Sequence, residues 1–263
     1  MKPLKQFYWM VILVLMVTTI TTPAAAPPQD ENLPIILYHN ITYNYIEENQ
    51  KLHVDPQRME EQFQAIKAAG YQTIFFDEYV DYLNGDAVLP EKPLIITFDD
   101  GYESNYKYAF PLLKKYGLKA TIFVITSRVG TQETQYPHFT WEQAREMEES
   151  GLVRIESHTN THPDMSTLSQ QEQQEEIRRS KYLIDSNLHK ECRVLSFPYG
   201  MHNEQAVALA QKAGYEAAVL VGDKGSNRKQ DGAFHLKRYT VSGFQTGQEL
   251  VDHIEYLKRH PDE

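Results

Sequence analysis

The sequence predicts an α/β protein, a (β/α) barrel of about eight parallel strands. Two observations indicate this fold. Short apolar runs alternate with segments of helical periodicity from residue 34 onward, and polar side chains follow directly after several of these runs. Strands separated by helices pair in parallel through right-handed crossovers. About eight strands favour a barrel over an open sheet, and the chemistry of barrels lies where the strands end.

In the first half of the chain, apolar runs and helical patterns alternate clearly. Apolar residues recur at helical spacing after Pro56, and Gly70 ends that pattern. The run that ends at Phe98 is apolar enough for a parallel strand buried on both faces. The expected elements are strands at 34–39, 71–76 and 92–98, and helices at 56–69, 77–83 and 104–116.

The second half continues the same alternation. Thr140 is a favourable N-cap, with Gln143 three residues later as its capping-box partner. The long helix at 169–188 is rich in charged residues, so we interpret it as a solvated face. The expected strands are 119–125, 152–156, 193–197, 217–221 and 236–241, and the expected helices are 140–150, 169–188, 203–213 and 246–260.

Composition excludes some classes of function. The chain has 263 residues, with 26 Lys and Arg against 36 Asp and Glu, and a net charge of −10. Nucleic-acid binding requires a basic face, so we expect no nucleic-acid partner. Cys192 is the only cysteine, which rules out an intramolecular disulfide, and we interpret it as a small buried apolar residue.

The N-terminus has the features of an export signal. Lys2 and Lys5 precede a mostly apolar stretch at 7–20, and small residues follow at 23–26. We expect residues 1–26 to be a signal peptide or membrane anchor, 27–33 a linker, and 34–263 one domain. The domain is therefore expected to be exported, in the cell envelope or outside the cell. A tether through residues 7–20 is the alternative to cleavage, because Pro27 follows the small residues directly.

Two adjacent carboxylates, Asp99 and Asp100, end the strand at 92–98 and precede Gly101. Neighbouring like charges are unfavourable unless a cation or a proton separates their roles, so the pair suggests a metal site or acid–base chemistry. The alternative is an ordinary Asp-Gly turn.

A second polar cluster contains His158 and His162, four residues apart after the strand at 152–156. On a helical turn, residues at this spacing share a face and can reach one ion. A carboxylate from Asp99–Asp100 would complete a two-His, one-carboxylate set with open positions, which is typical of a catalytic divalent metal. The alternative is a pair of surface histidines.

These residues resemble a known family. Thr97-Phe98-Asp99-Asp100-Gly101-Tyr102, together with His158-Thr159-Asn160-Thr161-His162, is similar to the motifs of the polysaccharide deacetylases, the NodB-homology domain of carbohydrate esterases. The resemblance covers roughly residues 34–245. It implies a distorted (β/α) barrel of about seven strands, and an N-acetylated polysaccharide as the substrate.

The resemblance also implies roles for individual residues. Asp99 corresponds to the general base, and Asp100, His158 and His162 correspond to the ligands of a metal, usually zinc. Ser196-Phe197-Pro198-Tyr199-Gly200 resembles the family's third motif, in which the tyrosine backbone N–H stabilises the oxyanion. The chemistry is consistent with these roles, because a metal can polarise an amide carbonyl and acidify water while a nearby carboxylate takes the proton.

The chain departs from the family pattern in two places. Ser196 stands where the family commonly has an arginine that orients the base; Arg238 is a candidate substitute, but we favour a surface position for it. The family's final Leu-x-His motif, which supplies the acid, reads Leu236-Lys237-Arg238 here. His39 is our candidate replacement, because Leu37-Tyr38-His39-Asn40-Ile41 resembles the subgroup acting on poly-N-acetylglucosamine. A structural histidine is the alternative.

From these observations we expect an exported deacetylase, dependent on Zn²⁺ or another divalent transition metal, that removes N-acetyl groups from peptidoglycan or poly-N-acetylglucosamine. The aromatic residues Tyr102, Tyr106, Tyr136 and Trp141 are candidates for stacking on sugar rings. An O-acetyl esterase, a glycosidase using two carboxylates and an inactive carbohydrate-binding barrel are the alternatives.

Overall fold

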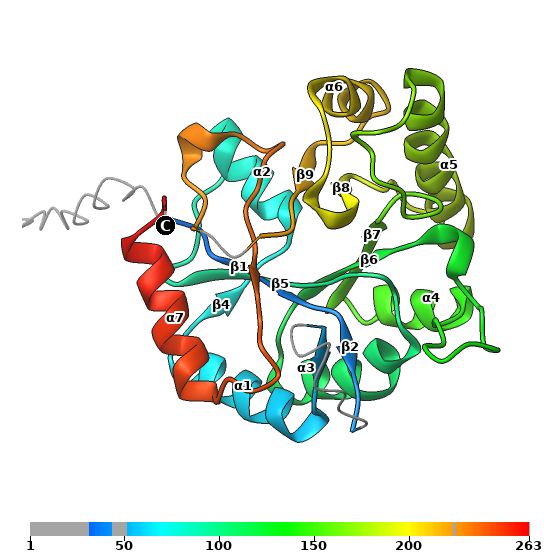
Figure 1. Ribbon diagram of the computed structural model, residues 1–263. Coiled ribbons are helices and arrows are strands. Elements are labelled where there is room, and N and C mark those ends of the chain that lie inside the picture. The colour runs from blue at the N-terminus through cyan, green and yellow to red at the C-terminus, as the bar shows by residue number, and fades with distance from the viewer. Residues whose placement is uncertain (1–31, 44–51, 223–224, 263) are drawn as a thin grey trace, which may run out of the picture.

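The computed structural model describes residues 32–43, 52–222 and 225–262 (Figure 1). The expected export segment at 1–26 and most of the expected linker lie outside these residues. Among the described helices, none combines the length and the apolar character that crossing a membrane requires.

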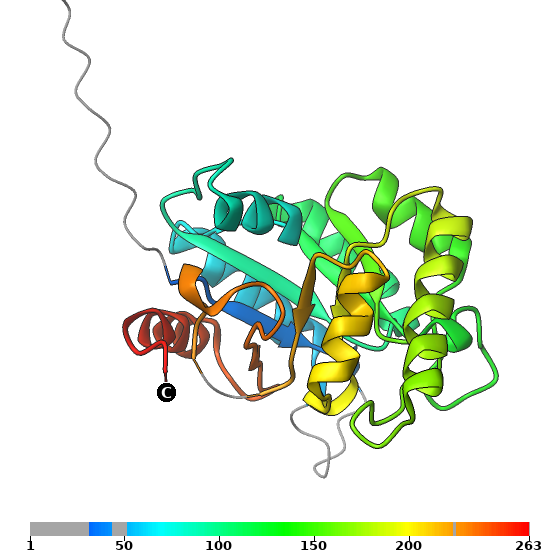
Figure 2. The same ribbon diagram turned by 90° about the horizontal axis from the view of Figure 1, so that it is seen from above.

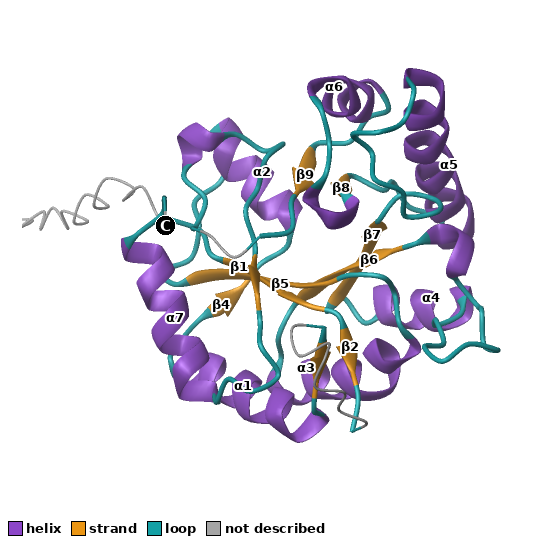
Figure 3. Cartoon of the chain, viewed as in Figure 1, coloured by secondary structure: helices purple, strands orange, loops and turns teal. Residues whose placement is uncertain are grey.

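A curled parallel sheet forms the centre of the molecule (Figures 1 and 3). Its strands follow the order β10-β1-β5-β6-β7-β8-β9, and β4 also pairs with β5. A separate parallel pair contains β2 (Asn40–Ile41) and β3 (His53–Val54). The sheet strands are β1 (Ile35–Tyr38), β4 (Gln72–Thr73), β5 (Pro93–Phe98), β6 (Ala120–Val124), β7 (Val153–Ser157), β8 (Val194–Ser196), β9 (Ala217–Val219) and β10 (Tyr239–Thr240).

The two edges of the sheet approach each other through one segment of the chain. Leu236 bridges to Val219 of β9, and three residues later Tyr239 pairs with Ile36 of β1. Residues 236–240 therefore span the gap between the first and last strands of the sheet. This arrangement confirms the predicted distorted barrel and explains the distortion, because the closing strand β10 has only two residues.

Helices other than α2 cover the outside of the sheet, and α2 packs against its inner face. Helices α1 and α7 pack together on one flank and α5 and α6 on another, as Figures 1 and 2 show. The helices are α1 (Pro56–Ala68), α2 (Phe76–Asn84), α3 (Phe110–Tyr116), α4 (Trp141–Glu149), α5 (Gln170–Leu188), α6 (Glu204–Lys212) and α7 (Gly247–Arg259).

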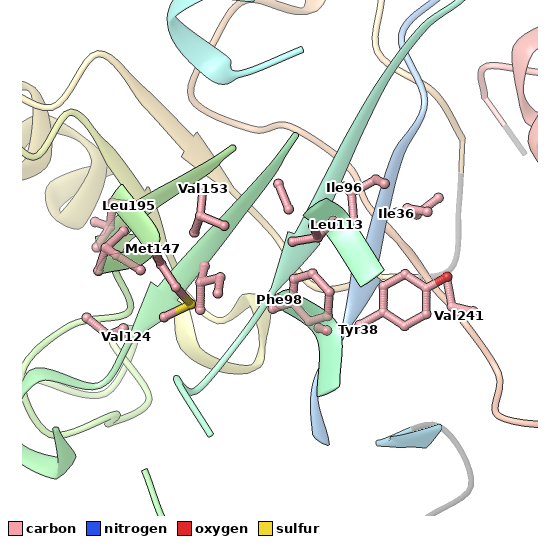
Figure 4. Packing of buried hydrophobic residues seen from close by; sticks show 14 of the residues in the cluster. Ile36, Tyr38, Ile96, Phe98, Leu113, Val124, Met147, Val153, Leu195 and Val241 are labelled. Carbon is pink, nitrogen blue, oxygen red and sulfur yellow. The ribbon is translucent and has the colours of Figure 1, made fainter. Parts of the chain in front are cut away.

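Strand side chains alternate between two apolar cores. The outer core lies between the sheet and the surrounding helices, and Figure 4 shows part of it, including Ile36, Ile96 and Leu195. The inner core contains the intervening strand residues, such as Ile35 and Ile95, packed against α2. Cys192 is fully buried, as expected for an apolar role.

The structure differs from three of the predicted elements. The predicted strand 71–76 is only Gln72–Thr73, because the Phe75 N–H donates to the Glu78 carboxylate and α2 begins at Phe76. The predicted strand 236–241 shortens to Tyr239–Thr240.

The predicted helix 104–116 is interrupted by a π-helical turn, Asn105–Ala109, before α3 begins. Pro111 accounts for the interruption. It lacks an N–H, and in a regular α-helix its ring would clash with the carbonyl four residues earlier.

Candidate metal centre and catalytic site

Strand β5 carries the first part of the site at its C-terminal end. Alternation along β5 directs Asp99 to the same inner face as Ile95 and Thr97. The chain then turns sharply, since Asp100 has φ 73° and Gly101 has φ 80°. A side chain at Gly101 would place its Cβ 2.9 Å from Val124 Cγ1, so glycine is required for this turn.

Asp100, His158 and His162 converge at this edge of the sheet. The distance from Asp100 Oδ1 to His158 Nε2 is 3.7 Å, and that to His162 Nε2 is 3.6 Å. One donor atom from each of the three residues lies within 4.8 Å of the other two. The structure therefore brings together the three side chains that the sequence suggested as ligands.

The histidines do not share a helical turn, so that part of the sequence reasoning was wrong. Residues 158–162 form a loop in which Thr159 has φ 63° and His162 has φ 67°. Glu176 of α5 holds this loop, because its carboxylate accepts hydrogen bonds from the N–H groups of Asn160 and Thr161 at 2.9 and 2.7 Å. The contact with Glu176, and not a helical turn, therefore brings the two histidines together.

The environment of the histidines suits metal ligands. The Ser196 carbonyl lies 2.8 Å from His158 Nδ1, so that nitrogen is the donor and Nε2 keeps its lone pair toward Asp100. Burial, and then the neighbouring His158, lower the pKa of His162 to about 4. His162 is therefore neutral at pH 7, the form that binds a metal.

Arg238 is fully buried and forms two hydrogen bonds with Asp99, so the expectation of a surface cation was wrong. Its Nη1 and Nη2 donate to Asp99 Oδ1 and Oδ2 at 2.7 and 2.6 Å. Nη2 also donates to Ser196 Oγ at 2.9 Å, and Nε donates to the Leu220 carbonyl at 2.8 Å. The small Ser196 side chain leaves room for the guanidinium, which reaches Asp99 from the segment that closes the barrel.

Asp99 is ionised in this environment. Complete burial would raise the pKa of its carboxyl group, but the positive charge of Arg238 acts in the opposite direction and prevails. The pKa of Asp99 therefore lies well below its ordinary range. Asp99 Oδ2 is also 3.6 Å from His158 Nε2, which places a permanent carboxylate directly beside the three-residue cluster.

His39 lies between β1 and β2, buried at the same end of the barrel. Its Nδ1 has no hydrogen-bond partner among the described residues. Burial keeps the pKa of His39 below its ordinary value, although the nearby carboxylates of Asp99 and Asp100 act in the opposite direction. A buried ring nitrogen without a partner is costly and suits a group that meets water or a ligand.

Tyr199 flanks the cluster on the His162 side. Its ring lies 4.7 Å from the His162 ring, and its backbone takes the left-handed conformation with φ 59°. Asp100, His162 and Tyr199 are all non-glycine residues with positive φ. Backbone strain of this kind persists where the surrounding structure enforces it, commonly at functional sites.

Two contributors were not assigned to the site from the sequence. Burial raises the pKa of the Tyr102 hydroxyl, and the nearby Asp100 carboxylate raises it further. Its place directly after Gly101 was a signal, but we considered it only for stacking on sugars. Glu176 gave no signal, since it lies inside a charged helix.

Comparison with known proteins gives a consistent result. A family profile described as polysaccharide deacetylase matches residues 86–218. The chain is 37% identical to the "Putative polysaccharide deacetylase YxkH" of Bacillus subtilis, over 86% of this chain and 77% of that protein. It is 29% identical to the poly-beta-1,6-N-acetyl-D-glucosamine N-deacetylase of Staphylococcus epidermidis, over 72% of this chain and 68% of that protein.

A solved structure has the same architecture. The deacetylase PplD of Streptococcus pyogenes, in complex with acetate, superposes with a TM-score of 0.78 at 28% identity. The match covers 86% of this chain and 99% of that one.

Proposed function

Because the chain belongs to the polysaccharide deacetylase family, we propose that it is a metal-dependent hydrolase that removes N-acetyl groups from an amino-sugar polymer. Poly-N-acetylglucosamine is the leading substrate, since one relative is named for that activity, and peptidoglycan is the second. The observation that carries the proposal is the convergence of Asp100, His158 and His162 beside the buried carboxylate Asp99.

Asp100, His158 and His162 would hold the metal. Two imidazole nitrogens and one carboxylate oxygen suit Zn²⁺ or a related divalent transition metal, and three protein ligands leave positions open. When bound, such an ion polarises the acetyl carbonyl and lowers the pKa of a water molecule. The tautomer of His158 and the neutral state of His162 prepare both rings for this role.

Asp99 accepts the proton of the attacking water. The ion pair with Arg238 keeps Asp99 ionised and fixes the orientation of its carboxylate. The water oxygen bonds to the acetyl carbon, and the backbone N–H of Tyr199 stabilises the oxyanion. The C–N bond then breaks as His39 supplies a proton to the leaving nitrogen, which gives acetate and a free amine.

The proposal is tested by metal content and acetate release in one preparation. We expect the protein to bind about one zinc ion and to release acetate from N-acetylglucosamine oligomers, with loss of activity in chelator and recovery on added zinc. His158→Ala should lose both zinc and activity, whereas Asp99→Asn should keep zinc and lose acetate release.

Other outcomes would point elsewhere. Acetate release from an O-acetylated polysaccharide alone would indicate an esterase. Full activity of Asp99→Asn would show that Asp99 is not the general base. Zinc binding without turnover of any acetylated polymer would indicate a carbohydrate-binding protein instead of an enzyme.

We also propose that the domain acts outside the membrane, in the cell envelope or beyond it. The support is the sequence pattern of residues 1–26. The N-terminal sequence of the protein recovered from culture medium and from membranes would distinguish cleavage from a retained tether. Recovery only from the cytosol would contradict the proposal.

A further inference from the structure

A second pair of histidines lies outside the candidate metal centre. The ring centroids of His202 and His235 are 5.3 Å apart, and Glu204 Oε1 lies 3.8 Å from His235 Nε2. We call these three residues the second histidine cluster. None of them takes part in the proposed reaction, yet two imidazoles and one carboxylate are a ligand set for a divalent transition metal.

His202 is oriented in the way that suits a metal ligand. The Gly200 carbonyl lies 3.0 Å from His202 Nδ1 and can only accept, so in the neutral ring Nδ1 carries the proton and Nε2 keeps its lone pair. The ring also stacks on the buried Phe197, with centroids 4.8 Å apart and planes at 15°. His158 has the same arrangement, with the Ser196 carbonyl at its Nδ1. A backbone carbonyl therefore fixes the tautomer in both clusters.

The spacing of the two rings suits one shared ion. A tetrahedral zinc ion holds two imidazole nitrogens about 3.3 Å apart. Rings whose centroids are 5.3 Å apart can supply such a pair of nitrogens. The rings of His158 and His162, with centroids 4.7 Å apart, are only slightly closer.

The second histidine cluster is looser than the candidate metal centre. The side chains of Glu204 and His235 are 90% and 45% exposed, so both can turn toward an ion without displacing packed atoms. The candidate metal centre is the one group of three among the described residues whose donor atoms all lie within 4.8 Å of one another. The second cluster must therefore rearrange slightly to close on an ion, and it should bind zinc more weakly.

The cluster connects two segments at the gap in the barrel. His202 lies two residues after the turn Pro198–Gly200, whose middle residue is the proposed oxyanion donor. His235 directly precedes residues 236–240, which span the gap between the first and last strands and carry Arg238. An ion shared by the two histidines would tie these two segments together.

We propose that the second histidine cluster is a second, weaker binding site for a divalent transition metal such as Zn²⁺. His202 Nε2 and one ring nitrogen of His235 are the nitrogen ligands, Glu204 is the oxygen ligand, and water completes the coordination. The inference goes beyond the proposed function and does not depend on it, because the mechanism uses none of these residues.

The test uses the variant His158→Ala, in which the candidate metal centre has lost a ligand. Calorimetric titration with zinc chloride should show a weak binding event in this variant, and the wild type should show the same event after a tighter one. Adding either His202→Gln or His235→Gln to His158→Ala should abolish the weak event. Because the His235 side chain is 45% exposed, His235→Gln tests the site even if His202→Gln fails to fold.

A matched control separates this site from general binding of zinc to surface histidines. His189→Asn replaces an exposed histidine at the end of α5, where the backbone has φ 52°, a conformation that asparagine tolerates. It should leave the weak event unchanged. A weak event that persists in both His202→Gln and His235→Gln, or that is absent from folded His158→Ala, would overturn the second site. Neither result bears on acetate release, which tests the proposed function separately.

Discussion

Asp99 lies between an arginine and a histidine at the buried end of β5. With Arg238 on one side and His158 on the other, its carboxylate is fixed in direction and in charge. Removing one partner of a buried ion pair leaves an uncompensated charge, which costs more than the pair contributes. At the scale of single residues, Arg238 therefore supports both the fold and the proposed base.

Arg238→Met should destabilise the protein by about 3–5 kcal/mol in urea unfolding. It should also move the acidic limb of the kcat/KM profile to higher pH. The sign follows because Arg238 lowers the pKa of Asp99, and without it burial raises that pKa, so the base becomes protonated at higher pH.

Two companion variants sharpen this prediction. Arg238→Met combined with Asp99→Asn removes both charges and should recover much of the lost stability, and Arg259→Met, at an exposed position, should change stability by less than about 0.5 kcal/mol. A pH profile unchanged in Arg238→Met would show that Arg238 does not act through Asp99.

His39→Ala should remain folded and zinc-loaded while kcat falls by about a hundredfold, the lower range for loss of a general acid. The reason is the position of the ring, buried at the metal centre with Nδ1 unpaired among the described residues. Zinc content and circular dichroism report the intact site, and steady-state kinetics report the loss. A wild-type kcat in His39→Ala would show that His39 has a structural role only.

At the scale of elements, short turns after buried strands build the site. Asp100 and Gly101 follow β5, the loop 158–162 follows β7, and Tyr199 follows β8, with positive φ in each turn. The strands supply a rigid base, and the turns supply the side-chain directions. A change in one turn should therefore affect the metal more than it affects the fold.

Gly101→Ala tests this relation. The new Cβ would lie 2.9 Å from Val124 Cγ1 at φ 80°, so we expect a loss of about 1–3 kcal/mol and a weaker affinity for zinc, because Asp100 must shift. Gly85→Ala is the matched control, since Gly85 has φ 86° but nothing within 4 Å of its Cβ position. It should lose about 1 kcal/mol and bind zinc normally. Equal zinc affinities in both variants, measured by calorimetry, would contradict the prediction.

The elements also show which features could be predicted from the sequence. The barrel and the convergence of Asp100, His158 and His162 were predictable, because apolar runs and short motifs are local features of the sequence. The partner of Asp99 was not, because Arg238 lies 139 residues away and its burial depends on closure of the sheet. The loop at 158–162 was misjudged as helical because its shape depends on Glu176 from α5.

At the scale of the whole molecule, the two ends of the barrel differ: one is filled by apolar packing, and the other carries the candidate metal centre. Helix α2 packs against the inner core, with Phe76, Tyr79 and Tyr82 buried, whereas Asp99 and the Asp100–His158–His162 cluster lie at the strand C-termini. Two neutral histidines at that end, the buried His138 and the half-buried His162, link stability to pH. His138 and His162 both have a pKa lowered to about 4, first by burial, then by Arg128 and by His158, respectively.

The free energy of unfolding of the metal-free protein should fall as pH decreases from about 6.5 to 4. The unfolded chain takes up protons on both histidines near pH 6.5, whereas the folded chain resists until about pH 4. Each histidine contributes a slope of up to about 1.4 kcal/mol per pH unit. Urea titrations in chelator should show this slope, and His138→Gln should reduce it. A flat profile over this range would contradict the assignment.

The closing segment 236–240 has a consequence for the synthesis of the enzyme. The family match ends at residue 218, yet the guanidinium that donates hydrogen bonds to Asp99, the proposed base, belongs to Arg238. A growing chain that has already folded its motif-bearing strands still lacks this partner and the last strand of the sheet. We therefore expect competence for hydrolysis only late in translation. A fragment cut after residue 218 keeps Asp99, Asp100, His158 and His162 but lacks Arg238, and we expect it to release no acetate.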